Sequence, residues 1–593
     1  MNLPVKGFLV LLFQLSFCSI FSQELEKDWR YMPNGDLIHS NGYVDQPYLL
    51  VDNDGAWICV YTTSNQHEGA KGQHIAVRRS RDQGKSWSEA IRIEEPGTES
   101  ASWGVPYLTS FGRIYVFFDY NGDKIHHLGS RQNIREDMLG WYCFRYSDDQ
   151  GKTWSDRYRI PMRKTAIDYM NQWKGKVQIF WGIDKPKRKD NGLLFAFTKI
   201  GEYMLEYSEG WLYHCNNIEI EKDPTKLNWQ LLPEGENGIR SPDWGDIQEE
   251  QNTVHMDSGT IACLYRTTQG HPLIAYSHDQ GHSWTAPEPP LDYNGRPLKN
   301  PRANPKIWKC SNGRYLLWYH HNGTRSFYNR NPAWIAGGVE QNGKIIWTQP
   351  ELLLYHDKSN RGPSYPDLIE LEGKYWMTET QKTEARIHEI PTSFLELLWS
   401  QFNVSASVTE GLVLDLSANL LEETDSVLIS NSRVGGEAAG FTFSVRLKSN
   451  LDMARGNIIV DTRDATGKGF WLEAAGSYTV KFSMSDGINT SSWQADPGIL
   501  QIRSRQEQEI SVSIDYRSRI IQFIIDGVVG DGKSLPFGWG RIDPKLEPIK
   551  TKWLHLNKHR KTITGLKYYN RPLLNTEIIG AYRFWKKEKG LGE

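Results

Sequence analysis

Cysteine is scarce in this sequence, which argues against a disulfide framework and against a cysteine-based metal site. Only 6 of the 593 residues are cysteines, and Cys18 lies in an N-terminal segment that we expect to be removed. The five others are odd in number and widely spaced, which is not typical of a disulfide framework. They are Cys59, Cys143, Cys215, Cys263 and Cys310. Several lie in apolar runs, which predicts buried thiols, and the absence of a Cys-x-x-Cys pattern means that we expect no metal or cofactor.

The sequence also lacks an excess of charge of either sign. Lys and Arg together number 69 and Asp and Glu number 71, so the formal net charge is −2. A polybasic surface for nucleic acid or for a membrane is therefore not expected. The chain is long enough for two or more domains.

Only one long apolar run is present, from Gly7 to about Phe21. Lys6 before the run and Ser22-Gln23 after it are typical of a cleaved signal peptide, here residues 1–22. The run is shorter than a good membrane-spanning helix. We therefore expect an exported protein, periplasmic or extracellular, without a membrane span.

Three copies of one pattern are present: SRDQGKSW (80–87), SDDQGKTW (147–154) and SHDQGHSW (277–284). In each copy, the Asp side chain can accept hydrogen bonds from turn amides and the Gly supplies the backbone freedom of a tight turn. The Trp can pack the turn onto the strands beside it. The pattern resembles the Asp-box of sialidases and their relatives, which implies a β-propeller.

The spacing of tryptophans sets the period of the repeat. The tryptophans that recur once per unit are Trp87, Trp154, Trp229, Trp284 and Trp347. Trp229 fits the position of a box that is missing, and a last group of strands at 365–379 has no box. A period of about 65 residues with about four strands per unit is typical of propeller blades. We predict an all-β protein in which residues 23–390 form a six-bladed β-propeller.

The composition changes after the propeller. Residues 391–405 include SFLELLWSQF, whose apolar spacing predicts a helical linker. Residues 406–593 contain alternating strands such as FTFSVRLKS and end with GLKYYNRPLLNTEI (565–578). This region resembles laminin-G/concanavalin-like jelly rolls, which implies a β-sandwich. Such a domain either braces the propeller or binds carbohydrate, and fold alone does not decide between the two.

The resemblance to sialidases extends beyond the boxes, over about 43–379. In the fourth unit Glu250, Asp257-Ser258-Gly259, Arg266 and the third box occur in the family's order. The resemblance implies that Glu250 activates the nucleophile and that Arg266 and Arg330 are two of three carboxylate-binding arginines. It also implies that Tyr365, in GPSYPDLIELEGKYW, is the catalytic tyrosine, although Pro366 stands where the family has Ser.

A paired Tyr and Glu make chemical sense at such a site. A phenol with a pKa near 10 is a weak nucleophile, and a neighbouring carboxylate can take its proton. A neutral nucleophile also avoids repelling an anionic sugar, and sialidases are an exception to the usual pair of carboxylates.

The first strand departs from the family. Sialidases have an Arg-Ile pair there, whereas this chain has Asp45-Gln46 in YVDQPYLL. The planar guanidinium of Arg grips a carboxylate through two bonds, which neither Asp nor Gln can do. Sialic acid is therefore not the expected substrate, and Asp45 and Gln46 suit sugar hydroxyls better.

The family's acid/base Asp is also missing. The corresponding loop, TTSNQHEGAKGQHIAVRRS (62–80), contains His67, Glu68 and His74 instead. Glu68 would serve as the general acid if burial raised its pKa, and either histidine could act near neutral pH. The seven-residue gap between the histidines is not an established metal-ligand spacing, so no metal is expected.

These residues predict an exo-acting glycoside hydrolase for a non-sialic glycan, either uronic or sulfated. Further candidates for substrate binding are Trp103, which could stack on a sugar ring, Arg361 and Asp168. Two alternatives stay open. One is a polysaccharide lyase that uses His67 or His74 with Tyr365 and Arg266, and the other is a glycan-binding protein without catalysis.

Overall fold

The three repeated patterns form the turns that the sequence predicts. In the first copy, Asp82 Oδ1 accepts the Ser86 amide at 2.9 Å, and Ser80 Oγ accepts the Gly84 amide at 2.9 Å. Gly84 has a φ of +87°, where an L side chain would be strained. Trp87 packs against a cluster that joins two neighbouring sheets. Each copy closes the outer edge of a sheet, and the other two have the same bonds.

The computed structural model describes residues 27–590 except 133, 205, 423–425, 430–438, 449–453, 477, 501–506, 550 and 557–561. The predicted signal peptide, residues 1–22, lies outside the described residues. No helix among the described residues is both long enough and apolar enough to cross a membrane.

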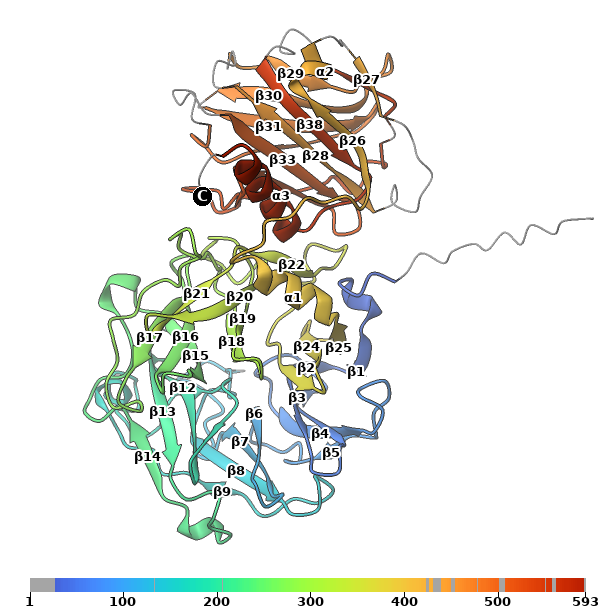
Figure 1. Cartoon of the computed structure of the whole chain (residues 1–593). Coiled ribbons are helices and arrows are strands. Elements are labelled where there is room, and N and C mark those ends of the chain that lie inside the picture. The colour runs from blue at the N-terminus through green and yellow to red at the C-terminus, as the bar shows by residue number, and fades with distance from the viewer. Residues whose placement is uncertain are drawn as a thin grey trace, which may run out of the picture.

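Six antiparallel sheets are arranged as the blades of a propeller, in the lower part of Figure 1. The first two comprise β2 (Tyr43–Val51), β3 (Trp57–Ser64), β4 (His74–Ser80) and β5 (Ile91–Arg92), then β6 (Ala101–Leu108), β7 (Ile114–Tyr120), β8 (Trp141–Ser147) and β9 (Tyr158–Arg159). The third comprises β10 (Phe180–Trp181), β11 (Lys187–Lys189), β12 (Gly192–Glu202), β13 (Glu206–Cys215) and β14 (Trp229–Leu232). The fourth comprises β15 (Gln248–His255), β16 (Ile261–Thr267) and β17 (Leu273–Ser277).

The last two sheets bring the chain back to its beginning. The fifth comprises β18 (Lys306–Lys309), β19 (Tyr315–Tyr319), β20 (Ala333–Gln341), β21 (Lys344–Trp347) and β22 (Glu351–Leu354). The sixth comprises β23 (Leu368–Leu371), β24 (Lys374–Thr380), β25 (Ala385–Ile390) and, from the N-terminal side, β1 (Asp36–His39). Pairing of β1 with β25 closes the ring, because a strand from the N-terminal side completes the sheet of the last blade.

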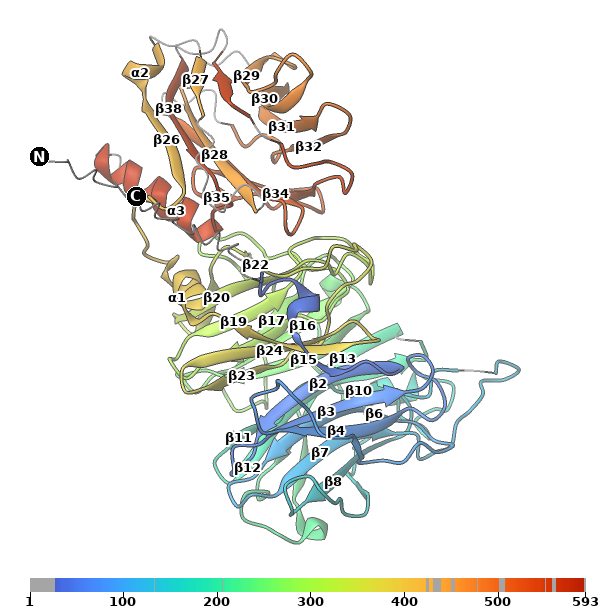
Figure 2. The same cartoon turned by 90° about the vertical axis from the view of Figure 1, so that its right-hand side faces the viewer.

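Two further sheets form a sandwich above the propeller (Figures 1 and 2). One comprises β26 (Leu412–Ser417), β28 (Gly440–Leu447), β33 (Gln508–Asp515), β34 (Ile520–Ile525), β35 (Val528–Val529), β36 (Trp539–Arg541) and β38 (Ile563–Tyr569). The other comprises β27 (Ser426–Leu428), β29 (Ile458–Asp461), β30 (Lys468–Gly476), β31 (Thr479–Asp486), β32 (Thr490–Gln494) and β37 (Trp553–His555). Their facing apolar side chains share one buried core. The predicted all-β fold, a propeller followed by a sandwich, is confirmed.

Three α-helices complete the described chain: α1 (Thr392–Ser400), α2 (Ala418–Glu422) and α3 (Asn575–Glu588). Helix α1 lies in the segment expected to be helical and packs Leu398 and Trp399 onto β20, where Gly337 leaves room for the indole. Short 3-10 helices lie at Met32–Asn34, Ala166–Tyr169, Pro224–Lys226 and Pro242–Trp244. The five cysteines outside the predicted signal peptide are free and buried, as the sequence predicts.

Candidate active site

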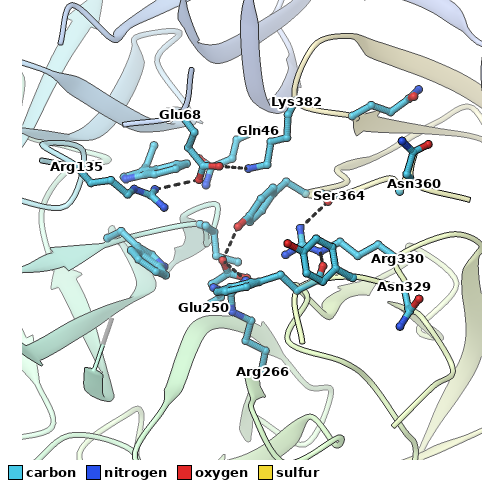
Figure 3. Close-up of a pocket in the computed structure, with 18 of the residues that line it drawn as sticks. Gln46, Glu68, Arg135, Glu250, Arg266, Asn329, Arg330, Asn360, Ser364 and Lys382 are labelled. Atoms are coloured by element: carbon cyan, nitrogen blue, oxygen red, sulfur yellow. Dashed lines mark hydrogen bonds and ion pairs between the residues drawn. The ribbon is translucent and has the colours of Figure 1, made fainter. Parts of the chain in front are cut away.

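A cavity with a volume of about 640 Å³ lies on the propeller axis, where side chains from all six sheets and their loops converge (Figure 3). We call it the central cavity. It is lined by Gln46, Glu68, Trp103, Arg135, Trp181, Ile183, Glu250, Arg266, Phe327, Tyr328, Asn329, Arg330, Ser359, Asn360, Gly362, Ser364, Tyr365, Gln381 and Lys382. It combines five aromatic side chains with cations and carboxylates, a composition suited to a polar ligand with apolar faces.

Four of the side chains that line the cavity belong to residues with an unusual backbone conformation, a positive φ angle. Gln46, Trp103, Glu250 and Tyr365 have positive φ angles of 51°, 62°, 63° and 45°. The strand register shifts at the first three, in β2, β6 and β15. A bulge re-aims a side chain at the end of a strand, and positive φ is uncommon outside Gly. Such conformations gather at functional sites, which makes this cavity the strongest candidate for one.

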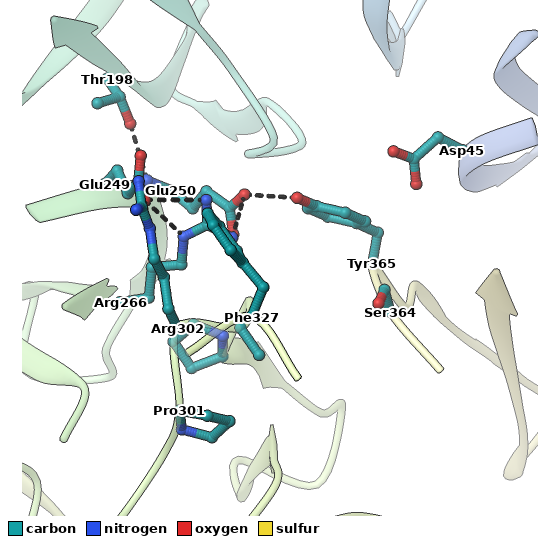
Figure 4. Close-up of polar contacts among 12 residues, drawn as sticks. Asp45, Thr198, Glu249, Glu250, Arg266, Pro301, Arg302, Phe327, Ser364 and Tyr365 are labelled. Atoms are coloured by element: carbon teal, nitrogen blue, oxygen red, sulfur yellow. Dashed lines mark hydrogen bonds and ion pairs between the residues drawn. The ribbon is translucent and has the colours of Figure 1, made fainter. Parts of the chain in front are cut away.

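The predicted Tyr–Glu pair is present in the central cavity (Figure 4). The Tyr365 hydroxyl donates to Glu250 Oε1 at 2.6 Å, and Arg266 Nη1 lies 2.8 Å from the same oxygen. Burial raises the pKa of Glu250, although attraction to Arg266 opposes the shift. Burial and the Glu250 carboxylate raise the pKa of Tyr365 well above its ordinary value. A carboxylate with a raised pKa is a stronger base, so Glu250 is suited to take the phenol proton.

Arg266 is already neutralised within the protein. Glu249 Oε1 lies 3.0 Å from Arg266 Nη2 and accepts Arg302 Nε at 2.7 Å. Two carboxylates therefore balance two guanidinium groups, and all four side chains are largely buried. The expectation that Arg266 holds an anionic substrate group is not supported, because Glu249 and Glu250 occupy its guanidinium.

Arg330 is the cavity guanidinium that is free to pair with an anion. It donates from Nη1 to Ser364 Oγ at 2.8 Å, from Nε to the Phe327 carbonyl at 2.9 Å and from Nη2 to the Arg302 carbonyl at 3.2 Å. Neutral oxygens thus orient it, and no carboxylate among the described residues forms an ion pair with it. An oriented cation without a counter-charge is a binding site for a carboxylate or sulfate.

The opposite wall of the central cavity is a chain of alternating charges. Lys382 Nζ contacts Asp45 Oδ2 and lies 3.4 Å from Glu68 Oε2. Glu68 Oε1 lies 3.0 Å from Arg135 Nη2, and Arg135 pairs with Asp137 at 2.6 Å. Burial acts to raise the pKa of Glu68, but Lys382, Arg135 and Arg330 outweigh it and lower the pKa to about 2. The condition for Glu68 as a general acid, a raised pKa, is therefore not met in the free protein.

Asp45 and Gln46 do not act together as expected. Asp45 is fully buried and accepts the Tyr43 hydroxyl at 2.8 Å and Lys382, so it does not line the central cavity. The bulge turns Gln46 into the cavity instead, where neither of its amide atoms has a hydrogen-bond partner among the described residues. Only Gln46 of this pair is placed to meet a substrate hydroxyl.

Four other candidates lie outside the central cavity. His67 is exposed, with Nδ1 3.0 Å from the Glu68 carbonyl, and His74 Nδ1 lies 3.0 Å from the Gly72 carbonyl. Arg361 donates to Thr383 Oγ1 at 2.9 Å. Asp168 is buried in an ion pair with Lys199 at 2.7 Å, which is a structural role. In contrast, Trp103 lines the cavity as expected and donates from its indole to the Asp137 carbonyl.

Three cations of the site were not predicted from the sequence: Arg135 and Lys382, which line the central cavity, and Arg302, which pairs with Glu249 beside it. Lys382 lies between β24 and β25, and Arg135 lies between β7 and β8. None of them stands in a motif.

The ion pairs of Glu68 predict a pH dependence of stability. An unfolded glutamate has a pKa of about 4.3, whereas that of Glu68 is lowered to about 2. A depressed folded-state pKa stabilises the protein above the unfolded value, and this contribution is lost as pH falls from about 4.3 to about 2. The stability difference between wild type and Glu68→Gln should therefore shrink in this window. Denaturant unfolding at a series of pH values measures it, with the exposed Glu389→Gln as the control; a constant difference would contradict the assignment.

The sequence matches the family model described as "BNR repeat-like domain" over residues 55–377, more than half of the chain. The chain belongs to this family. The predicted resemblance to Asp-box propellers is thereby confirmed. No curated protein gives a significant match to the sequence.

Solved structures similar to this BNR repeat-like protein include several sialidases. A Trypanosoma rangeli sialidase is 11% identical, with a TM-score of 0.43 over 94% of this chain and 97% of that one. A leech intramolecular trans-sialidase is 15% identical, with a TM-score of 0.44 over 62% and 70% of the two chains. A Dyadobacter fermentans protein of unknown function is also 15% identical, with a TM-score of 0.42 over 60% and 98%.

Proposed function

We propose that the protein is an exported glycoside hydrolase that removes a terminal, non-sialic sugar with an anionic group, either a uronic acid or a sulfated sugar. The observation that carries the proposal is the 2.6 Å hydrogen bond between Tyr365 and Glu250 in the central cavity. Membership of the BNR repeat-like family, together with the sequence's resemblance to Asp-box sialidases, supports the reaction class. Export rests on the signal-peptide pattern of the sequence alone.

In the proposed reaction the Tyr365 oxygen attacks the anomeric carbon while Glu250 takes the phenol proton. The bond from that carbon to the leaving oxygen breaks, and the leaving oxygen receives a proton from Glu68. Water, deprotonated by Glu68, then displaces tyrosine from the sugar, and Glu250 returns its proton to Tyr365. Because Glu68 is a carboxylate in the free site, substrate must first weaken its pairs with Lys382 and Arg135 to raise its pKa.

The composition of the central cavity supports an anionic sugar that is read differently from sialic acid. Gln46 stands in the cavity at the strand where the family has its first arginine, and Arg266 is already paired. This leaves Arg330 for the anionic group. The ring of Tyr328 is 79% exposed, which leaves it free to stack on a sugar, whereas that of Phe327 is 44% exposed and already has the Arg302 guanidinium 4.3 Å from its centroid.

Arg330→Met is expected to raise KM with little change in kcat. A hydrogen bond to a charged group contributes about 1.5–3 kcal/mol, so KM should rise about 10- to 100-fold. Arg361→Met is the matched control, because Arg361 lies outside the central cavity and bonds to Thr383. Steady-state kinetics on the anionic substrate test the assignment, and equal KM values for the two variants would contradict it.

A screen of the purified protein against plant, algal and host glycans tests the proposed function. New reducing ends without an ultraviolet-absorbing product support hydrolysis. An unsaturated, absorbing product would identify a lyase instead, although neither His67 nor His74 lines the central cavity to act as its base. Binding without any turnover would indicate a glycan-binding protein. Efficient release of sialic acid would refute the inference that Gln46, in place of the family's first arginine, disfavours sialic acid as the substrate.

A further inference from the structure

One wall of the central cavity is a long loop between β19 and β20. Residues 320–332 make no strand of their own, and four consecutive residues from Phe327 to Arg330 line the cavity. Within the loop, Asn322 Nδ2 donates to the Asn329 carbonyl at 2.9 Å. Figure 2 shows the sandwich above the propeller, and Trp539 of the sandwich contacts this loop at His321.

The sandwich holds both ends of this loop by hydrogen bonds. Trp539 Nε1 donates to the His321 carbonyl at 2.9 Å, and His321 Nε2 lies 3.1 Å from the Gly530 carbonyl. The Gly323 amide donates to the Pro536 carbonyl at 2.8 Å. At the other end, Arg541 donates to the carbonyl of Asn331, the residue next to Arg330. The sandwich contacts therefore flank the residues that line the cavity.

The sandwich also contacts a second propeller loop, which contains Lys299 and Arg302. Lys299 Nζ donates to the carbonyls of Asp531 and Leu535, at 2.8 and 2.9 Å, and also to that of Lys533. The Arg302 amide in turn donates to the Ser326 carbonyl at 3.1 Å. A buried ammonium must satisfy its donors, so this loop of the sandwich is held firmly against the propeller.

Apolar packing makes the same junction continuous with the propeller core. Trp539 and Ile520 of the sandwich lie in one buried cluster with Tyr319 and Trp334 of the propeller. The Trp334 and Trp539 ring centroids are 5.9 Å apart. A loosely tethered module would show a small polar contact instead.

We propose that the sandwich is part of the substrate-binding machinery, with Trp539 and Arg541 as positioning residues that fix the loop 320–332 and hence Arg330. This inference rests on the proposed function in assigning Arg330 to an anionic sugar. Arg330 has a planar donor set whose bonds to an anion depend on its orientation. Loss of the contacts from the sandwich would leave that orientation to a loop without strands, so substrate affinity would fall while the Tyr365–Glu250 pair stayed in place.

Hydrogen exchange of the full chain, measured by mass spectrometry, tests the inference. Trp539→Ala and Arg541→Ala should speed exchange in the loop 320–332 by 10-fold or more, as expected from loss of about 1.4 kcal/mol of local stability. Trp553→Ala and Arg463→Ala are the matched controls. Trp553 is 49% exposed, and Arg463 pairs with Asp461 inside the sandwich, so both should leave the loop unchanged.

Kinetics separate positioning from general destabilisation. With an anionic glycan, Arg541→Ala should raise KM at least 10-fold with kcat nearly unchanged, and Arg541→Lys should restore part of the loss because it keeps a donor to Asn331. Unchanged exchange and KM in folded Arg541→Ala protein would overturn the inference. Hydrogen exchange needs no substrate. A wild-type protein that turns over no glycan would therefore refute the proposed function, while exchange in the loop 320–332 would still test whether the sandwich positions this loop.

Discussion

Tyr365→Phe is expected to reduce turnover about 1,000-fold, within the range for loss of a group that takes part directly in proton and bond transfer. The substitution removes one oxygen, and the ring stays in its buried place, so substrate binding should persist. Glu250→Gln should have a similar effect, and the double variant should lose little more, because the two residues act as a unit. Single-turnover kinetics and equilibrium binding of the same glycan measure the two quantities separately.

Tyr375→Phe is the matched control for this prediction. Tyr375 is also buried, but its hydroxyl meets Glu370 at 3.3 Å and it does not line the central cavity. Its turnover should equal that of the wild type. Full activity of Tyr365→Phe would exclude the nucleophile assignment, and loss of binding together with turnover would point to damage of the cavity.

Arg266→Leu should lower the free energy of unfolding by about 3–5 kcal/mol, the usual cost of breaking a buried ion pair from one side. The Glu249 and Glu250 side chains are 0% and 1% exposed, so the loss of the guanidinium would leave buried negative charge with less compensation. Arg302 still pairs with Glu249, but within the described residues Glu250 would keep only the Tyr365 hydroxyl. Denaturant unfolding followed by Trp fluorescence measures the loss.

Lys344→Leu is the control for burial. Lys344 pairs with Glu288, but the two side chains are 54% and 51% exposed. Exposed pairs contribute about 0–1 kcal/mol, so the effect should be small. Equal losses in the two variants would mean that Arg266 is not the counter-charge of a buried carboxylate pair.

The sequence predicts much of the fold because its strongest signals are local. The Asp, Gly and Ser of each repeated turn bond within eight residues, and their spacing marks the outer edge of each sheet. The resemblance to sialidases implies roles for Glu250, Arg266, Arg330 and Tyr365, and the structure brings all four into one cavity. Helix α3 was not predicted, although Ile578, Ile579 and Trp585 form its buried side.

The rest of the site depends on geometry that no local pattern records. Asp45 and Gln46 are adjacent, and which of them faces the cavity is decided by a bulge of the β2 backbone. One residue of register reverses the two faces of a strand. Lys382 and Arg135 come from loops of different sheets, and their charges set the pKa of Glu68 against the direction that burial alone would give. Sequence reasoning could count these charges but could not place them together.

Trapping the reaction on the protein tests the central claim most directly. Once the screen has identified a substrate, wild-type protein is mixed with its 2-fluoro glycosyl fluoride, quenched, digested and analysed by peptide mass spectrometry. The account predicts the mass of one fluorinated sugar on the peptide that contains Tyr365, and none in Tyr365→Phe. A sugar attached to Glu250 or Glu68 instead, in a protein that hydrolyses the parent glycan, would contradict it.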